Sequence, residues 1–105
     1  ETELLVDKSI EIINKIKCNQ VAEVGVGSGI ITIMLAKRFK HLKFIATDIN
    51  KKAIELARVN AKKFNVEDRI EFYHTSYLDG IEAKIDFLVS NPPYIQNGIK
   101  LDENV

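Results

Sequence analysis

The chain has 105 residues, of which 46% are hydrophobic and 29% charged, an ordinary globular balance that suits one small domain. Its fifteen basic residues offset fifteen acidic ones, which argues against a protein held to nucleic acid mainly by phosphate neutralisation. The lone cysteine, Cys18, excludes an internal disulfide and fits the reducing cytoplasm, and the apolar runs fall short of the roughly 20 residues that a membrane span needs.

The first half of the chain predicts two helices separated by a short strand. Apolar residues at helical spacing, such as Val6 and Ile10, predict a helix over residues 3–17. A short apolar strand is predicted over residues 20–25. The next apolar stretch, over residues 28–39, is predicted to be a helix.

The second half predicts three strands and one long helix. A strand over residues 43–48 leads into the clearest helix of the sequence, over residues 50–65, for which Asn50 is the expected N-cap. Residues 69–75 and 84–90 are predicted to be strands. Strands that alternate with helices favour βαβ units, and therefore an α/β fold with a parallel sheet.

In parallel sheets of this kind, ligands bind beyond the carboxyl ends of the strands. The candidate site is therefore expected at residues 23–29, at Asp48, after Thr75 and at residues 90–94. These segments are far apart in the sequence, but all four follow predicted strands. They can therefore line one crevice.

Three glycines, Gly25, Gly27 and Gly29, follow the first predicted strand in the stretch EVGVGSG. Glycine permits a positive φ and lets a ligand approach the backbone closely, although a tight turn without a ligand would show the same pattern. A dinucleotide fingerprint would need its third glycine where Ile30 stands, so the loop fits a nicotinamide cofactor poorly. We favour a ligand at this loop.

Asp48 ends the second predicted strand, where a carboxylate can accept two hydrogen bonds from a ribose diol. The alternative role is to cap the following helix, for which Asn50 is better placed. The glycine loop and the acid each favour a nucleoside ligand, so together they indicate a nucleoside site.

The stretch SNPPY, residues 90–94, follows the last predicted strand. The Asn91 side-chain oxygen and the Pro92 carbonyl can accept hydrogen bonds from a planar amide or aromatic amine and aim its weakly nucleophilic nitrogen at a methyl donor. Pro92 and Pro93 form a stiff arm, because each lacks an N–H and has a fixed φ. Tyr94 can pack on the planar substrate or near a cationic sulfonium.

Together these motifs resemble the amino-group N-methyltransferases that use S-adenosylmethionine, and most specifically the HemK/PrmC family of protein-(glutamine-N5) methyltransferases, which modify peptide chain release factors. The resemblance is carried by ETELLVD at residues 1–7, by EVGVGSG, and by VSNPPYI at residues 89–95. It covers essentially the whole chain. It implies a Rossmann-like class I methyltransferase fold with helices on both faces of a parallel sheet, of which this chain holds the first four strands in the order 3-2-1-4.

The resemblance also implies the residues of the site. The cofactor-binding residues would be Glu23, Gly25, Val26, Gly27, Ser28, Gly29, Asp48, Tyr77 and Asn91. The catalytic residues would be Asn91, Pro92, Pro93 and Tyr94. Glu23 stands where the family more usually has Asp, and we expect it to keep the negative charge; Tyr77 would lie against the adenine. No metal is expected, and Met34 is read as a core residue.

The resemblance implies that residues 1–105 are part of one methyltransferase domain, without the family's N-terminal substrate-recognition domain and C-terminal strands. The favoured function is methylation of a release-factor glutamine in the cytoplasm, without a membrane. Two alternatives stay open: a nucleic-acid methyltransferase acting on adenine N6 or guanine N2, and a non-catalytic nucleoside-binding fragment. Because residues 84–90 would form an edge strand, we expect the chain alone to be poorly active and to self-associate, or to be stable only beside the rest of its enzyme. Residues 95–105 are expected to be the least ordered.

Overall fold

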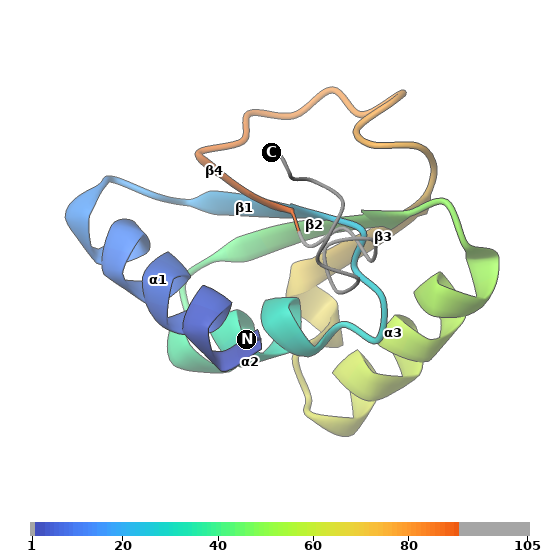
Figure 1. The fold of residues 1–105 in the computed structure, drawn as a ribbon, viewed down its shortest axis with the longest axis horizontal. Helices are drawn as coiled ribbons and strands as arrows, with labels where there is room; N and C mark the ends of the chain where they lie inside the picture. The colour runs from blue at the N-terminus through green and yellow to red at the C-terminus, as the bar shows by residue number, and fades with distance from the viewer. Residues whose placement is uncertain (1, 91–105) are drawn as a thin grey trace, which may run out of the picture.

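The fold is a four-stranded parallel sheet with helices packed against it, as the computed structural model in Figure 1 shows for residues 2–90. The alternation of helices and strands predicted from the sequence is confirmed. In chain order the elements are α1 (Thr2–Lys15), β1 (Gln20–Val24), α2 (Ile30–Arg38), β2 (Lys43–Asp48), α3 (Lys51–Lys63), the 3-10 turn η1 (Glu67–Arg69), β3 (Ile70–His74) and β4 (Phe87–Ser90).

The strands lie in the order β3-β2-β1-β4 and all pairs are parallel, which confirms the predicted order. Val21 of β1 pairs with Phe44 of β2 on one side and with Phe87 of β4 on the other, and Phe44 pairs with Ile70 of β3. All four carboxyl ends therefore lie at one edge of the sheet, which we call the carboxyl edge. The opposite edge is called the amino edge.

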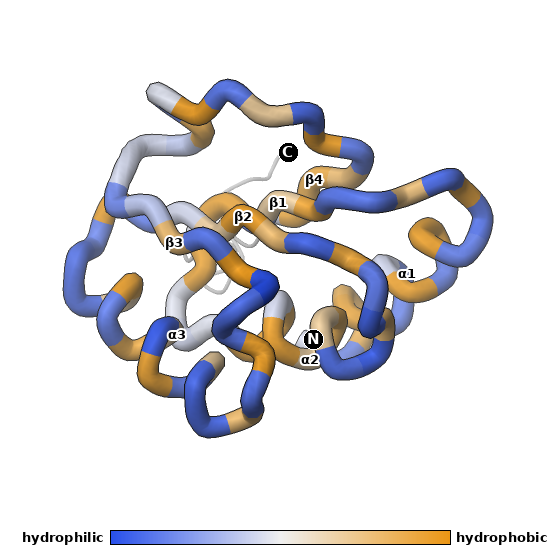
Figure 2. The backbone as a smooth tube through the Cα atoms, turned by 180° about the vertical axis from the view of Figure 1, so that it is seen from behind, coloured by the Kyte–Doolittle hydropathy of each residue, from blue (hydrophilic) through white to orange (hydrophobic). Residues whose placement is uncertain are grey.

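The three helices lie on the same face of the sheet (Figure 1), because α1 packs against α2 and α2 against α3. The strand residues on this face, including Val21, Phe44 and Ile70, form one buried apolar cluster with the helices. Figure 2 shows apolar and polar residues alternating along α3, the pattern of an amphipathic helix. We expected helices on both faces of the sheet, but within residues 2–90 they cover only one face.

The other face is crossed by the connection between β3 and β4, residues 75–86, which contains no helix or strand (Figure 1). Thr47 of β2 ties this connection to the sheet, because its hydroxyl donates to the Tyr77 carbonyl at 2.7 Å. Ala22 and Ile45 are buried although they lie outside the main apolar cluster. Their positions alternate along the strands with those of the cluster, so they belong to this second face.

Side-chain hydrogen bonds lie at the starts of two elements, α3 and β4. The Asn50 side chain accepts from the N–H groups of Lys52 (2.9 Å) and Ala53 (3.4 Å), which confirms the predicted cap of α3. β4 begins later than predicted, at Phe87, because the Asp86 carboxylate accepts from the N–H groups of Asn19 (2.9 Å) and Gln20 (3.0 Å). The Asp86 N–H also donates to the Gln20 carbonyl at 2.9 Å, so both the backbone and the side chain of Asp86 hold the approach to β4 against β1.

Arg69 holds the end of α2 against the start of β2. Its guanidinium donates to the carbonyls of Ala36 (2.8 Å), Phe39 (3.1 Å) and Leu42 (3.2 Å). The guanidinium therefore satisfies carbonyls that the helix itself leaves unpaired at its negative end. The prediction that Met34 is a core residue is wrong: its side chain is 40% exposed on the outer side of α2.

Candidate cofactor site

The glycine loop between β1 and α2 has the backbone conformation that the sequence predicted. Gly25, Gly27 and Gly29 have φ values of 76°, 57° and 89°, a region that other residues rarely adopt. At Gly29 an added Cβ would lie 3.0 Å from the Ala57 Cβ, so this glycine also permits the loop to approach α3. Glycine is needed at Gly29 for two separate reasons.

Both neighbouring elements hold the loop in place. The N–H groups of Gly25 and Val26 each donate to the Thr47 carbonyl at 2.9 Å, which links the loop to the end of β2. The Asn60 side chain donates to the Ser28 carbonyl at 2.9 Å, which links it to α3. α2 then begins without a side-chain cap, and a helix N-terminus of this kind favours a negatively charged group.

Asp48 lies directly against the glycine loop. One carboxylate oxygen accepts from the Gly27 N–H at 3.0 Å and the other accepts from the Asn50 N–H at 2.9 Å. The structure therefore joins two predicted site residues that are 21 positions apart in the chain. Each carboxylate oxygen has a second lone pair, so Asp48 can still accept hydrogen bonds from a diol.

Glu23 lies beneath the loop rather than in the open site. Its side chain is 2% exposed, and its Oε1 accepts from the Thr32 hydroxyl of α2 at 2.6 Å. Burial raises the pKa of Glu23 to about 8 although the hydrogen bonds from Thr32 oppose the shift, and the charge of Asp48 raises it further. Burial therefore works against the negative charge that the sequence analysis expected Glu23 to keep.

Two bulky exposed side chains stand near Asp48. Tyr77 is 56% exposed and has a φ of 55°, and its backbone is held by the Thr47 hydroxyl. Ile49, which directly follows Asp48, is 73% exposed, and its carbonyl lies 3.0 Å from Nε2 of His74. The sequence analysis missed Ile49. An apolar residue next to a predicted ribose acid, at a strand end, was the available signal.

The predicted catalytic residues Asn91, Pro92, Pro93 and Tyr94 lie outside the described residues, as does the segment 95–105 that was expected to be the least ordered. Ser90, the last described residue, pairs with Val24 at the carboxyl edge. The glycine loop starts at the residue after Val24. The described chain therefore ends beside the glycine loop.

No group of three or more His, Cys, Asp or Glu side chains within residues 2–90 could hold a metal ion. None of the helices in this part of the chain combines the length and the apolar character needed to cross a membrane.

Comparison with known families and proteins matches residues 2–105 to the family described as "Methyltransferase small domain". The chain is 46% identical over 98 residues to a release factor glutamine methyltransferase of Dictyoglomus turgidum, covering 90% of this chain and 35% of that protein. It is 40% identical over 95 residues to a bifunctional methyltransferase of Rickettsia prowazekii, covering 90% of this chain and 18% of that one. The chain thus spans about a third or less of these relatives' length.

Solved structures with the same fold include a ribosomal protein L11 methylase from Lactobacillus delbrueckii subsp. bulgaricus. Its TM-score is 0.72 at 34% identity, over 87% of this chain and 46% of that one. An RNA methyltransferase from Salinibacter ruber, in complex with S-adenosyl-L-homocysteine, has a TM-score of 0.72 at 22% identity, over 82% of this chain and 56% of that one. The second likeness shows the fold alone.

Proposed function

Because this chain belongs to the methyltransferase small domain family, we propose that it is the cofactor-binding part of an S-adenosylmethionine-dependent N-methyltransferase domain that acts in the cytoplasm. Its substrate is the glutamine side-chain amide of a peptide chain release factor. The observation that carries the proposal is the hydrogen bond between Asp48 and the Gly27 N–H. It makes the ribose acid and the glycine loop one preformed unit, which a nucleoside cofactor needs.

Each part of this unit suits a different part of the cofactor. The glycine loop offers close approach to backbone atoms, and the uncapped N-terminus of α2 suits the carboxylate of the methionine moiety. Asp48 accepts from the ribose hydroxyls. The exposed side chains of Ile49 and Tyr77 provide apolar surface for the adenine.

The sequence of the NPPY segment supports an amide nitrogen as the acceptor. S-adenosylmethionine supplies an electrophilic methyl group when bound. The Asn91 oxygen and the Pro92 carbonyl accept hydrogen bonds from the amide N–H groups and orient the nitrogen toward that methyl group. When bound, S-adenosylmethionine would supply the methyl group and leave as S-adenosylhomocysteine, and the amide proton would pass to water. The names of relatives such as the Dictyoglomus turgidum protein support a release factor as the source of the amide.

Transfer of a labelled methyl group separates this function from its alternatives. The assay uses the complete enzyme and compares a release factor with DNA and RNA as acceptors. We expect label on the release factor. Label on DNA or RNA alone would favour a nucleic-acid methyltransferase, and cofactor binding without transfer to any acceptor would favour a nucleoside-binding module.

The cofactor affinity of an Asp48 variant tests the role of the contact between Asp48 and Gly27. Asp48→Ala removes charge-assisted hydrogen bonds to the ribose, a loss of about 1.5–3 kcal/mol, so affinity for S-adenosylmethionine should fall roughly 10–100-fold. Asp7→Ala removes an exposed carboxylate of α1 and serves as the matched control. Titration calorimetry showing the wild-type affinity in Asp48→Ala would remove the ribose assignment, and tighter binding of NAD would overturn the cofactor.

Asn91→Ala in the complete enzyme tests the proposed substrate clamp, by which we mean the hydrogen bonds from the substrate amide to the Asn91 oxygen and the Pro92 carbonyl. It should slow methyl transfer by roughly 100-fold or more with little change in cofactor affinity, because the acceptor acts mainly in the transition state. Asn14→Ala on α1 is the control. Near-normal turnover in Asn91→Ala would show that the clamp is not part of the mechanism.

We also propose that the chain on its own self-associates through β4. Among residues 2–90, β4 pairs with β1 alone, so its outer backbone groups are open to pairing with another strand. Leu88, which is partly exposed on this strand, offers a test. Light scattering should show oligomers that Leu88→Lys reduces, because a charge on an edge strand discourages pairing. A monodisperse monomer at micromolar concentration would refute this interface.

A further inference from the structure

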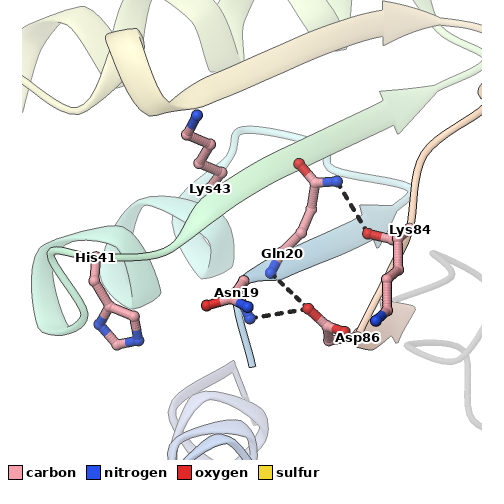
Figure 3. A pocket seen from close by; sticks show the side chains of 6 residues that line it. All are labelled: Asn19, Gln20, His41, Lys43, Lys84 and Asp86. Atoms are coloured by element: carbon pink, nitrogen blue, oxygen red, sulfur yellow. Dashed lines mark hydrogen bonds between the residues drawn. The ribbon is translucent and has the colours of Figure 1, made fainter. Parts of the chain in front are cut away.

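A polar depression lies at the amino edge of the sheet, where β1, β2 and the approach to β4 begin (Figure 3). It has a volume of about 440 Å³. The strands are four to six residues long, so roughly 15 Å of sheet separates it from the glycine loop. The depression is lined by Asn19, Gln20, His41, Lys43, Lys84 and Asp86.

The lining of the depression carries more positive than negative charge, because it holds two lysines, Lys43 and Lys84, and one carboxylate, that of Asp86. Both ion pairs found within residues 2–90 involve Glu11 of α1, so neither Lys43 nor Lys84 has a described carboxylate within 4.0 Å. The carboxylate of Asp86 is already engaged by two backbone N–H groups. These hydrogen bonds hold the pKa of Asp86 below its ordinary value, and the charge of Lys84 lowers it further.

These cations are not required to cap the nearest helix end. Lysines near the amino edge of a parallel sheet often compensate the negative C-terminal ends of the helices. Here the C-terminal carbonyls of α2 accept instead from Arg69, which also binds the Leu42 carbonyl next to Lys43. Arg69 thus caps the end of α2, and Lys43 is not needed for that role.

The donors surround the depression from two sides. In Figure 3 the side chains of His41 and Lys43 lie on one side of Gln20, and that of Lys84 lies on the other. The Gln20 amide is fixed between them, because its Nε2 donates to the Lys84 carbonyl at 3.0 Å. A ligand seated here would meet two ammonium groups, an imidazole and the amide of Asn19, together with the Asp86 carboxylate, whose Oδ2 accepts from two backbone N–H groups.

We propose that this depression binds phosphate groups. Phosphate oxygens accept hydrogen bonds only, and they match a set of lysine, imidazole and amide donors. Two sources share this chemistry, a small free phosphate anion and the backbone of a nucleic-acid strand. The site lies at the opposite edge from the cofactor unit and goes beyond the proposed methyl transfer, on which it does not depend.

Titration of the full chain, followed by the backbone amide signals in two-dimensional NMR, tests the site. Inorganic pyrophosphate and a short single-stranded oligouridylate are the two probes. We expect saturable shifts at Asn19, Gln20 and Lys43, and roughly fivefold weaker binding in Lys43→Gln and in Lys84→Gln. The matched control is the pair Lys51→Gln and Lys52→Gln, which removes equal charge from the exposed start of α3.

The relative affinities of the two probes distinguish a small phosphate anion from a nucleic-acid backbone. Saturation by pyrophosphate at least as tight as by oligouridylate assigns the site to a small anion, and tighter binding of oligouridylate through the same residues assigns it to a nucleic-acid backbone. Shifts that do not saturate, or an equal loss of affinity in the control variants, would overturn the proposal. The amide spectra themselves report whether each variant is folded.

Discussion

The carboxyl edge and the amino edge of the sheet are stabilised by different kinds of contact. At the carboxyl edge the loop has three left-handed glycines, backbone atoms bind one another across elements, and the acid Glu23 is buried with a hydroxyl partner. At the amino edge, the charged side chains of Arg69 and Asp86 bind backbone groups of neighbouring segments. The edge that holds the candidate cofactor site therefore contains groups that reduce stability, whereas the opposite edge is stabilised by ordinary charged hydrogen bonds.

The largest expected effect is a pH dependence of stability caused by Glu23. Its pKa is about 8 in the folded chain against an ordinary 4.5, so the folded state binds a proton that the unfolded state releases between these values. The favourable contribution is complete below pH 4.5 and is lost as the pH rises toward 8. The free energy of unfolding should therefore fall by up to about 1.4 kcal/mol per pH unit in this window.

Glu23→Gln should remove this slope and make the chain more stable than the wild type near pH 8. Urea unfolding at several pH values measures the slope, and Glu55→Gln on the exposed side of α3 is the control. An unchanged slope in Glu23→Gln would mean that the buried carboxyl is already ionised.

A second large effect is expected at Gly29. Gly29→Ala adds a Cβ only 3.0 Å from that of Ala57 in a residue with a φ of 89°, and it should destabilise the fold by roughly 3 kcal/mol. Gly80→Ala is a matched control, because Gly80 has a φ of 79° with nothing within 4 Å of the added atom. Gly80→Ala should destabilise the fold by about 1 kcal/mol, because it only places a non-glycine residue at a positive φ. Equal losses in thermal unfolding would contradict the close contact with α3.

At the amino edge, Arg69→Met should destabilise the fold by roughly 2–3 kcal/mol, because three carbonyls lose their donor. Arg58→Met removes a guanidinium that lies 5.1 Å from the centre of the Phe72 ring, a contact worth about 0.5–1 kcal/mol. Chemical unfolding of the two variants separates the effects. If both lose the same amount, the Arg69 clamp is not important for stability.

The smallest effect concerns Asp86, which is exposed to solvent. Its pKa is lowered by the N–H groups of Asn19 and Gln20, so its contribution is present above pH 3.8 and is lost as the pH falls through the lower folded value. Asp86→Asn should make exchange of these two amide hydrogens faster near neutral pH and weaken the acid dependence of stability. Unchanged exchange rates would show that the pairing of β1 with β4 does not need this carboxylate.

The sequence predicted what depends on local patterns. Asn50 was identified as a cap and the three glycines as a loop, because both roles depend on residues close by in the chain. Asp48 was selected as the candidate ribose acid because it ends an apolar strand, and the strand order came from the family resemblance.

What the sequence missed depends on contacts between distant segments. The raised pKa of Glu23 results from its burial under the loop, which no local pattern reveals. β4 starts late because the Asp86 carboxylate binds backbone 66 and 67 positions earlier. Met34 was placed in the core by its apolar neighbours, but the rotation of α2 turns Ile31 and Leu35 inward instead.

The hydrogen bond between Asp48 and Gly27 has a consequence for binding kinetics. Because the acid already holds the loop, a ligand meets a site that has little left to rearrange, and association should be limited by encounter and orientation rather than by loop ordering. Differences in affinity among ligands would then appear as differences in residence time. A cofactor and its spent product would arrive at similar rates and leave at different ones.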